Sequence, residues 1–336
     1  MSGKIRFVII GTGNIANAYI SAVENIRNAE TVAFVSRTKK YPSQVTDSSK
    51  YEIAAELTDI KSEYEAVIIC TPNGLHHISA LEAARLGKHV LCEKPLDITI
   101  ESTSSMIAAC RSAKVKLAVA YQRRYSSDNP VIKKMLLEGK LGKVYSVDLS
   151  VKNYRDESYY SNAPYRGTYS IDGGGPFIQQ AVHYIDLYAW YFGIPEKITS
   201  HLSKLHHNIE AEDYGIAICS HSNGMIGNII ASSAIKPGFP ARMEIHTSKG
   251  TVIMENDIIT LWSIEGIENP TQTSSLAQKH TGASNPFVND TANHELIISD
   301  FIDSIKEDRE PLINGESGEM ATRIVLDIYR NNQTPF

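Results

Sequence analysis

Ile5-Arg6-Phe7-Val8-Ile9-Ile10 runs directly into Gly11-Thr12-Gly13-Asn14-Ile15-Ala16, and the N-terminal fold can be argued from this stretch. The apolar run is typical of a strand buried on both faces of a sheet. The glycines that follow have the GxGxxA spacing of a dinucleotide-binding turn. The first glycine allows a tight turn, the second lets the backbone approach a pyrophosphate, and the small third residue permits close helix packing. An amphipathic pattern follows, as this interpretation requires.

Further buried strands follow at intervals that leave room for helices. Apolar runs at 31–35, 66–70, 89–92 and 117–121 alternate with helical patterns, of which the clearest cover 78–86 and 102–113. Strands and helices in this alternation predict a doubly wound parallel sheet of the Rossmann type, closing near residue 121. One further helix is expected around residues 48 to 57.

Ser36-Arg37-Thr38 follows the second strand, where a dinucleotide site holds the adenosine ribose. NAD-specific sites place an acidic residue here, whereas an arginine accommodates the extra phosphate of NADP. The sequence therefore favours NADP over NAD. The alternative is that Arg37 stacks on the adenine and leaves the choice open.

The loop after the next strand reads Thr71-Pro72-Asn73-Gly74-Leu75-His76-His77 and could cover the ribose and phosphates of the cofactor. Adjacent histidines suggest a metal, but neighbours at a helix start point in different directions and no carboxylate stands at ligand spacing. We expect helix-start hydrogen bonds for this pair, and no metal site.

Cys92-Glu93-Lys94-Pro95 closes the strand at 89–92. The residue before a proline favours extended geometry, so Lys94 should lie at the carboxyl end of the strand, where open α/β sheets bind ligands. A partly desolvated lysine there can transfer protons near neutral pH. The alternative is a surface Lys-Pro turn.

Composition limits the class of protein. A chain of 336 residues suggests two domains, and a net charge of -5 without a long basic block argues against a nucleic-acid partner. The four cysteines have no CxxC spacing and are expected to be reduced. No signal peptide pattern and no apolar run of about 18 residues is present, so we expect no membrane segment and a cytoplasmic location.

The second half has the pattern of a meander of strands. Strands are expected at 144–151, 214–220, 225–232, 242–247, 251–255 and 258–264, with turns at 221–224 and 248–250. Helices are expected at 177–192, 293–306 and 317–329. Residues 266–290 are rich in turn formers and are expected to form a long mobile loop.

The motifs GTGNIA at 11–16, TPNGLHH at 71–77 and CEKP at 92–95 together resemble the glucose-fructose oxidoreductase, inositol dehydrogenase and rhizopine-catabolism (Gfo/Idh/MocA) family. The resemblance continues through YQRRY at 121–125, LGKV at 141–144, YRGT at 165–168, DGGG at 172–175 and QQAVHYIDL at 179–187. It implies a Rossmann domain over 1–121. It also implies an α/β substrate domain over 122–336, with a large, mainly antiparallel, open-faced sheet that makes homodimer or homotetramer contacts.

The resemblance assigns Lys94 and His183 to catalysis. One of them would accept the hydroxyl proton of the substrate while the other hydrogen-bonds the same oxygen, and the sequence leaves both assignments open. For His183 the alternative is a buried helix histidine bonded to the backbone or to Asp186.

The expected cofactor contacts come from Gly11, Thr12, Gly13, Asn14, Ile15, Ser36, Arg37, Thr38, Thr71, Pro72, Asn73, His76, Glu93, Lys94, Gln122, Tyr165 and Arg166. The expected substrate contacts come from Lys94, Arg124, Tyr154, Asp172, Gln179 and His183, with Arg155 as a further candidate. Ordinary surface roles for Arg124, Tyr154 and Arg155 remain open.

Two positions near His183 need separate comment. Gln179 stands where many family members carry an aspartate, which weakens a mechanism with a carboxylate beside the histidine and makes Gln179 a candidate ligand for a sugar hydroxyl. Asp172 could supply a carboxylate, but capping the helix after Gly175 is the favoured role.

The sequence thus predicts an oxidoreductase that transfers a hydride between a nicotinamide cofactor and a hydroxyl or keto carbon of a sugar, which could be an aldose, an inositol or a nucleotide sugar. One alternative is an NAD-dependent glycoside hydrolase of the same family. Another is a silent NADP sensor, against which the presence of both Lys94 and His183 argues. A non-catalytic scaffold would require every motif to be accidental.

Overall fold

The computed structural model describes residues 3–126, 128–271 and 291–334. Contacts divide the chain into two compact units, Met1–Gln122 with Asn289–Glu319 and Arg123–Val288 with Met320–Phe336. The assignment of domain functions to 1–121 and 122–336 stays a prediction.

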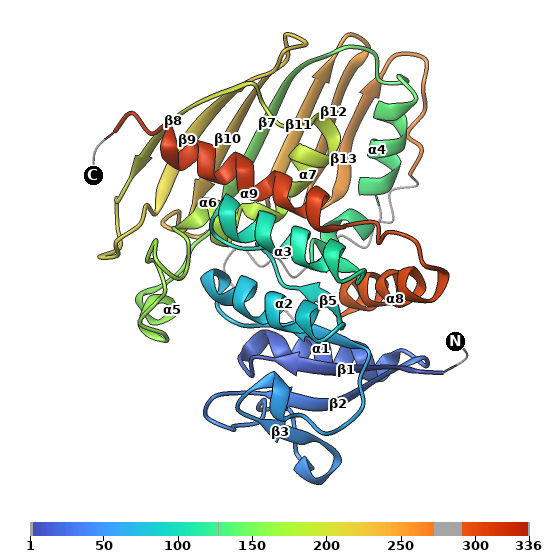
Figure 1. Ribbon diagram of the computed structural model, residues 1–336. Helices are drawn as coiled ribbons and strands as arrows, with labels where there is room; N and C mark the ends of the chain where they lie inside the picture. Colours follow the sequence, from blue (N-terminus) through green and yellow to red (C-terminus); the bar gives the residue numbers. More distant parts are fainter. Residues whose placement is uncertain (1–2, 127, 272–290, 335–336) are drawn as a thin grey trace. The chain divides into compact units, whose positions relative to one another are not determined.

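The first unit is built on a six-stranded parallel sheet in the order β3-β2-β1-β4-β5-β6 (Figure 1). Its strands are β1 (Ile5–Ile10), β2 (Ala29–Val35), β3 (Glu52–Ala54), β4 (Ala66–Ile69), β5 (His89–Cys92) and β6 (Leu117–Val119). Its helices are α1 (Asn14–Asn25), α2 (His76–Arg85), α3 (Ile100–Ser112) and α8 (Ala292–Glu307). The strand order and the parallel pairing confirm the predicted Rossmann sheet.

The prediction of a helix at residues 48–57 is wrong. The chain forms two short 3-10 turns, Ser48–Lys50 and Leu57–Asp59, with the edge strand β3 between them. Strand β3 pairs in parallel with the end of β2, from Ala33↔Glu52 to Val35↔Ala54. Because β2 is an otherwise unpaired edge at this point, backbone pairing outweighs local helix propensity.

Helix α8 packs in the first unit although it follows the second sheet in sequence. Its Phe301 ring lies 6.4 Å from that of Phe7 in β1, and Asn25 Nδ2 donates to Glu295 Oε1 at 2.7 Å. The sequence predicted this helix but gave no sign of the unit it joins.

The second unit contains a seven-stranded sheet in the order β13-β12-β11-β7-β10-β9-β8, antiparallel except between β7 and β10. Its strands are β7 (Val144–Lys152), β8 (Lys197–Ser203), β9 (Tyr214–Ser220), β10 (Ile226–Ser232), β11 (Arg242–Thr247), β12 (Gly250–Glu255) and β13 (Ile258–Ile264). Its helices are α4 (Asn129–Leu137), α5 (Glu157–Ser161), α6 (Pro176–Gln179), α7 (Val182–Phe192) and the later part of α9 (Gly315–Arg330). The predicted large, mainly antiparallel sheet is confirmed, while strand β8 was missed.

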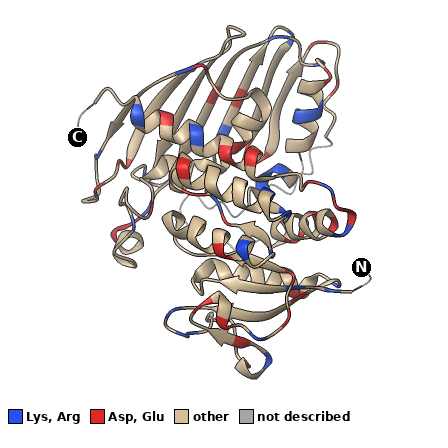
Figure 2. Ribbon diagram, viewed as in Figure 1, with Lys and Arg blue, Asp and Glu red and all other residues tan. Residues whose placement is uncertain are grey.

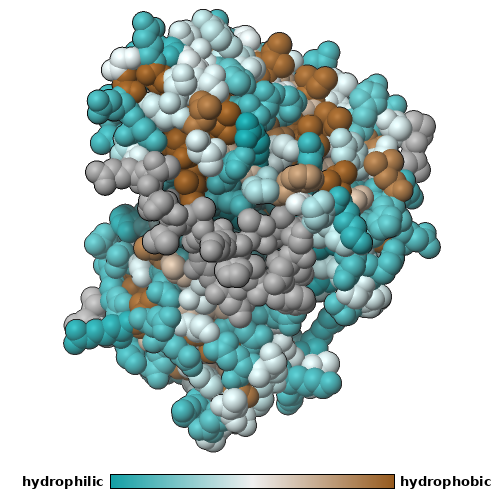
Figure 3. Space-filling model, turned by 180° about the vertical axis from the view of Figure 1, so that it is seen from behind, coloured by the Kyte–Doolittle hydropathy of each residue, from teal (hydrophilic) through white to brown (hydrophobic). Residues whose placement is uncertain are grey.

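Helices cover one face of this sheet and leave the other open (Figure 1). A Cβ atom on Gly227 would come within 2.2 Å of the Tyr188 hydroxyl of α7, so at this position the covered face has no room for a side chain. On the opposite face Ile218 and Ile226 are 53% and 56% exposed. Seen from behind in Figure 3, hydrophobic residues gather over this part of the surface.

The prediction of a single helix at residues 177–192 is also wrong. Helix α6 ends at Gln179 and α7 begins at Val182. The Ala181 N–H reaches back five residues to the Pro176 carbonyl at 2.8 Å, which widens the last turn of α6 and lets the chain restart as α7. Gln179 and His183 therefore lie on two different helices.

Acidic and basic residues are mixed along the described ribbon, with no region of one sign (Figure 2). No helix in the described ranges is long and apolar enough to cross a membrane. Of the loop expected at 266–290, residues 272–290 lie outside the described residues.

Candidate active site

The turn after β1 has the geometry that a bound pyrophosphate needs. Gly11 has a φ of 96°, and a Cβ atom there would lie 2.6 Å from the Cys70 carbonyl oxygen, so the close contact with the end of β4 requires glycine. Gly13 is the N-cap of α1 and gives it no side-chain cap, while nothing lies within 4 Å of the position of its Cβ. No side chain of Gly13 caps α1 or fills the space beside it, and uncapped N–H groups at a helix start can bind an anion.

Three hydroxyl groups link the loops that follow β1 and β2. Thr12 Oγ1 donates to Ser36 Oγ at 3.3 Å, and Ser36 Oγ lies 3.3 Å from Thr38 Oγ1. Arg37 stands beside them, is exposed, and forms no ion pair with any residue that the structure describes. The structure thus brings the expected ribose-binding residues together at the carboxyl edge of the sheet.

His76 ties two further loops of the site together. Its Nδ1 lies 2.9 Å from the Pro95 carbonyl oxygen and its Nε2 lies 2.9 Å from that of Thr71. The ring is fully buried, which lowers the pKa of His76. The side chain of His77 instead contacts Asp97, whose carboxylate also accepts the His77 N–H at 3.0 Å.

The His77 N–H thus makes a hydrogen bond at the helix start, whereas the His76 ring connects two loops. No group of three or more His, Cys, Asp or Glu residues in the described ranges is placed to hold a metal ion.

Glu93 fixes the loop that carries Lys94. Its Oε1 accepts a hydrogen bond from the buried Tyr19 hydroxyl of α1 at 2.7 Å, and its Oε2 accepts the Lys94 N–H at 3.1 Å. Lys94 itself is half-buried and precedes a cis peptide bond to Pro95. Tyr19, which the sequence analysis did not single out, therefore links α1 to the loop of the expected catalytic lysine.

Two buried polar atoms at this edge lack partners within the described part of the chain. They are Thr71 Oγ1, on the loop after β4, and Gln122 Oε1, just after β6. Buried hydroxyl and amide groups are almost always hydrogen-bonded, so such atoms are suited to a ligand. Together with the open phosphate cradle at Gly13, they make the first unit fit a nicotinamide dinucleotide.

His183 lies in the first turn of α7 in the second unit and is half-buried. The alternative partner considered for it, Asp186, is occupied elsewhere. Both oxygens of Asp186 bind the guanidinium of Arg124, at 2.8 Å from Nε and 2.6 Å from Nη2, and both side chains are buried. This gives Arg124 a structural role, and its contact with substrate stays a prediction.

The expected capping role of Asp172 is wrong. Its Oδ2 accepts the Gly167 N–H at 2.9 Å, whereas α6 is capped by Glu212, whose carboxylate accepts the N–H groups of Gly175 at 3.2 Å and Phe177 at 3.4 Å. Glu212 was missed because it lies 37 residues later in the chain. Gln179 donates from Nε2 to the Asp172 carbonyl at 2.5 Å, which fixes the residue expected to bind a sugar hydroxyl.

The glycine run before α6 allows this arrangement. A Cβ atom on Gly175 would lie 1.9 Å from the Glu212 carbonyl oxygen, and one on Gly174 would lie 2.3 Å from the Tyr329 hydroxyl. Tyr329 in turn donates to Glu212 Oε1 at 3.0 Å. Burial raises the pKa of Glu212 to about 7.

Several expected ligand residues lie around α5 in the second unit. Arg166 stacks over the Tyr159 ring at 4.2 Å, and Arg155 lies 5.5 Å from the same ring. Tyr154 points to a different neighbourhood, with Lys236 Nζ 5.2 Å from its ring and the His206 ring at 6.3 Å. Tyr165 accepts the Thr168 hydroxyl at its carbonyl oxygen, at 2.6 Å.

Comparisons with known proteins agree with this architecture. A family model described as "Oxidoreductase family, NAD-binding Rossmann fold" matches residues 5–121, and one described as "GFO/IDH/MocA C-terminal domain" matches residues 131–253. Inositol 2-dehydrogenase of Rhizobium meliloti is 26% identical over 94% of this chain and 92% of its own length.

Two solved structures are similar over nearly the whole chain. The WlbA dehydrogenase from Bordetella pertussis, in complex with NADH and UDP-GlcNAcA, is 29% identical with a TM-score of 0.85 over 99% of both chains. The WlbA enzyme from Chromobacterium violaceum, with the same two ligands, is 27% identical with a TM-score of 0.84 over 98% of this chain and 94% of that one.

Proposed function

This chain belongs to the Gfo/Idh/MocA oxidoreductase family, and we propose that it transfers a hydride between a nicotinamide cofactor and a hydroxyl or keto carbon of a sugar. The observation that carries the proposal is the uncapped N-terminus of α1 beside Gly13, in a chain that also supplies Lys94 and His183. A phosphate cradle alone would suit many nucleotide-binding proteins, whereas two groups able to accept a proton suit a reaction on an alcohol.

The proposed cofactor residues divide by role. The N–H groups at the start of α1 bind the pyrophosphate, and the hydroxyl groups at Thr12, Ser36 and Thr38 face the ribose. The nicotinamide ring, when bound, supplies a two-electron hydride acceptor or donor. We keep the remaining contacts expected from the sequence, at Asn14, Ile15, Pro72, Asn73, Tyr165 and Arg166, as part of the proposal.

Lys94 and His183 act on the substrate oxygen. In the oxidation direction His183 accepts the hydroxyl proton, and Lys94 hydrogen-bonds the same oxygen and stabilises its developing charge. The reverse assignment uses the same two side chains. Tyr19 and Glu93 hold the Lys94 loop through the 2.7 Å hydrogen bond between them, and Glu212 holds α6 just before His183.

We propose NADP as the preferred cofactor on the basis of Arg37. Its exposed guanidinium follows β2 with no acidic residue beside it, and it is available for a phosphate on the ribose. Relatives differ in this respect: the scyllo-inositol 2-dehydrogenase IolW of Bacillus subtilis, 27% identical over 74% of this chain, is named for NADP(+), while the WlbA structures contain NADH.

The proposed substrate is a polyhydroxylated ring, which could be an aldose, an inositol or a nucleotide sugar. The Gln, Tyr, Arg and His side chains between 154 and 183 can donate to or accept from several hydroxyls. The similarity to the WlbA structures supports a nucleotide sugar.

We assign nucleotide binding to residues 1–121, and substrate binding and self-association to 122–336. The open face of the seven-stranded sheet, with Ile216, Ile218 and Ile226 exposed on neighbouring strands, suits contact between copies of this chain. We expect a homodimer or homotetramer. The four cysteines are buried free thiols, which suits the reducing cytoplasm.

The experiment that tests this function is an assay for reduced nicotinamide. Purified protein is mixed with NADP or NAD and with separate panels of aldoses, inositols, sugar phosphates and nucleotide sugars. Turnover with one panel supports the proposal and identifies the substrate class. Bound nucleotide without net reduction on any panel would contradict it and point to the hydrolase or the sensor.

A further inference from the structure

One buried side chain connects the loop that follows β4 with the loop that follows β5. The His76 ring, at the first position of α2, is 0% exposed. Its Nδ1 lies 2.9 Å from the Pro95 carbonyl oxygen, and its Nε2 lies 2.9 Å from the Thr71 carbonyl oxygen. Both ring nitrogens are therefore at hydrogen-bond distance from groups that can only accept a proton.

The two loops lie side by side because their strands are neighbours, with β4 and β5 paired in parallel up to Ile69↔Cys92. The loop after β4 begins at Thr71, whose buried Oγ1 has no partner in the described part of the chain and suits a ligand. The loop after β5 carries Lys94. His76 thus contacts a loop expected to bind the cofactor and the loop of the expected catalytic lysine.

The number of protons on the ring decides how many of these hydrogen bonds can form. A neutral imidazole carries one N–H, whereas an imidazolium carries two. Burial lowers the pKa of His76, although the two carbonyl groups and the negative charges of Asp97 and Glu93 act in the opposite direction. The ring therefore carries one proton at neutral pH, and the Thr71 and Pro95 carbonyl groups compete for a single N–H.

The position of this proton decides which loop His76 holds. With the proton on Nδ1, the ring donates to the Pro95 carbonyl, and the lone pair of Nε2 faces the Thr71 oxygen. With the proton on Nε2, the ring donates to the Thr71 carbonyl, and the lone pair of Nδ1 faces the Pro95 oxygen. Two buried acceptors that face each other repel, so each state stabilises one loop and leaves the other less firmly held.

A second contact attaches the start of α2 to the Lys94 loop in either state. Asp97 is 0% exposed, its Oδ2 accepts the His77 N–H at 3.0 Å, and its Oδ1 accepts the Ile98 N–H at 2.7 Å. The start of the helix therefore does not depend on the His76 ring alone. We expect conservative replacements of His76 to fold and to change the two loops.

The contact with Pro95 holds the Lys94 loop on the side that Glu93 does not reach. Glu93 Oε2 accepts the Lys94 N–H at 3.1 Å, before the side chain, whereas His76 contacts the carbonyl of the residue that follows it. A shift of about 1 Å in a reacting group can cost about 10²-fold in rate. The bond from Nδ1 therefore bears on the rate, and the bond from Nε2 bears on the loop after β4.

We propose that His76 is a positioning residue that shares one ring proton between two loops: its Nε2 bond prepares the Thr71 loop for the nucleotide, and its Nδ1 bond places Lys94 for the reaction. This inference rests on the proposed dehydrogenase function, since both loops belong to the same site. It gives His76 a role inside the protein, whereas the sequence placed it among the cofactor contacts.

Two amide variants separate the two bonds. The amide nitrogen of asparagine can take the place of Nδ1 and that of glutamine the place of Nε2, so H76N keeps a donor for Pro95 and H76Q keeps one for Thr71. H76N should raise the Kd of NADP, measured by calorimetry, roughly fivefold or more and keep kcat within about threefold. H76Q should keep that Kd within about threefold and lower kcat roughly fivefold or more.

The variant H89N is the matched control. His89 lies at the other end of β5, and its Nδ1 accepts the Lys116 N–H at 2.9 Å, a bond that the asparagine oxygen can also accept. H89N should keep the Kd and kcat of the wild type within about threefold. Parallel losses of affinity and rate in H76N and H76Q would show that the ring only fills space and would overturn the proposal, and so would wild-type values in both.

The ring itself gives a readout that needs no turnover. In protein with ¹⁵N-labelled histidine, both nitrogens of His76, assigned by their loss in H76N or H76Q, should show shifts between those of a protonated and an unprotonated nitrogen. One fully protonated and one bare nitrogen would contradict the shared proton.

Binding and turnover also separate this inference from the proposed function. Weaker NADP binding in H76N than in H76Q, without reduced nicotinamide from any sugar, would support the role of His76 and contradict the dehydrogenase. Turnover with the same Kd and kcat in both variants would support the dehydrogenase and contradict the role of His76. If one variant does not fold, the other still decides, because each is expected to change only one of the two quantities.

Discussion

At the scale of single residues, the proposed reaction depends on Lys94, whose neighbours in the chain are held by hydrogen bonds. Lys94 is preceded by Glu93, which binds both the Lys94 N–H and the Tyr19 hydroxyl, and followed by Pro95, whose carbonyl oxygen contacts His76. The neighbours of Lys94 are thus fixed by buried hydrogen bonds. A side chain so supported suits transfer or stabilisation of a proton at one defined oxygen.

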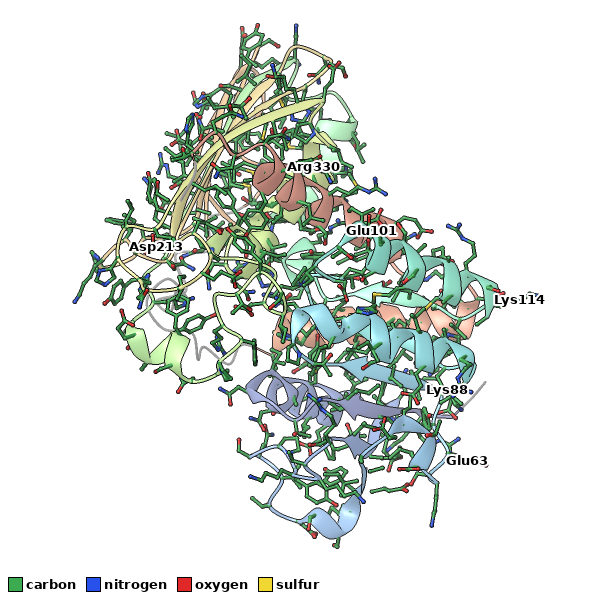
Figure 4. All side chains as sticks on the ribbon, turned by 60° about the vertical axis from the view of Figure 1, so that its left-hand side comes forward. Glu63, Lys88, Glu101, Lys114, Asp213 and Arg330 are labelled. Atoms are coloured by element: carbon green, nitrogen blue, oxygen red, sulfur yellow. The ribbon has the colours of Figure 1, made fainter. Side chains whose placement is uncertain are left out.

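Replacement of Lys94 by alanine should lower kcat by roughly 10²-fold or more, since general acid-base groups contribute about that much, while the Kd of the nucleotide changes by less than about tenfold. Lys88, labelled in Figure 4, precedes the same strand and donates to the Tyr64 carbonyl, so Lys88→Ala is a matched control that should retain turnover. Full activity in Lys94→Ala would remove this lysine from the mechanism.

Cofactor choice is also a property of one residue. Arg37→Ala should raise the KM for NADP by roughly tenfold or more and leave that for NAD within about threefold, because only NADP offers the ribose phosphate that the guanidinium would bind. Steady-state kinetics with both nucleotides measure this. Equal losses for the two would mean that Arg37 stacks on the adenine.

At the scale of elements, a distant carboxylate holds the junction of α6 and α7. Glu212 is fully buried, caps α6 through the Gly175 and Phe177 N–H groups, and accepts the Tyr329 hydroxyl of α9. Burial raises its pKa from 4.5 to about 7. Between these values the folded state holds a proton that the unfolded state releases, so this group makes the free energy of unfolding fall as pH rises through that range.

Glu212→Gln removes this titration and keeps an oxygen able to accept hydrogen bonds. Between pH 5 and pH 8 the wild type should therefore lose more unfolding free energy than the variant, by about 3 kcal/mol as an order of magnitude. Denaturant titrations at several pH values measure the difference. Glu210→Gln, an exposed change on the same segment, should follow the wild type; parallel curves for wild type and Glu212→Gln would contradict the raised pKa.

A comparison of the predicted helices and strands with those of the structure shows which features the sequence could predict. Local signals sufficed where one strand or turn carries its own pattern, as in β1 with Gly11 and Gly13, and in the alternating strands of the second sheet. Local signals failed where an element is stabilised by residues that lie far away in the sequence. The cap of α6, the pairing of β3 with β2 and the packing of α8 on the first sheet all depend on contacts between distant segments.

The same reasoning applies to the candidate site. The motifs placed Lys94, His183 and the phosphate turn in sequence, but they gave no sign of Tyr19 or Glu212, which lie outside every motif. Arg124 was a candidate for substrate contact, with an ordinary surface role left open, and that contact stays a prediction. Only the structure shows its guanidinium bound by both oxygens of the buried Asp186.

At the scale of the whole molecule, we expect self-association through the open face of the seven-stranded sheet. Ile218 and Ile226 lie on the adjacent strands β9 and β10 and are 53% and 56% exposed. Changing both to lysine would place charges in the proposed contact and should convert a dimer or tetramer to monomer, as measured by analytical ultracentrifugation. Ile78→Lys, at an equally exposed position on α2, should leave the assembly intact.

A wild-type protein that sediments as a monomer at micromolar concentration would contradict the proposed assembly. A double variant with the mass of the wild-type oligomer would place the contact elsewhere on the molecule.

The central claim is that this chain moves a hydride from a sugar carbon to a nicotinamide. The most direct measurement uses sugars of the productive class with deuterium on every ring carbon, and analyses the nicotinamide by mass spectrometry after a single turnover. The account predicts one deuterium in the reduced nucleotide from the wild type, and formation of the same labelled nucleotide roughly 10²-fold or more slowly by Lys94→Ala. Reduced nucleotide without deuterium, or sugar consumed without any reduced nucleotide, would contradict it.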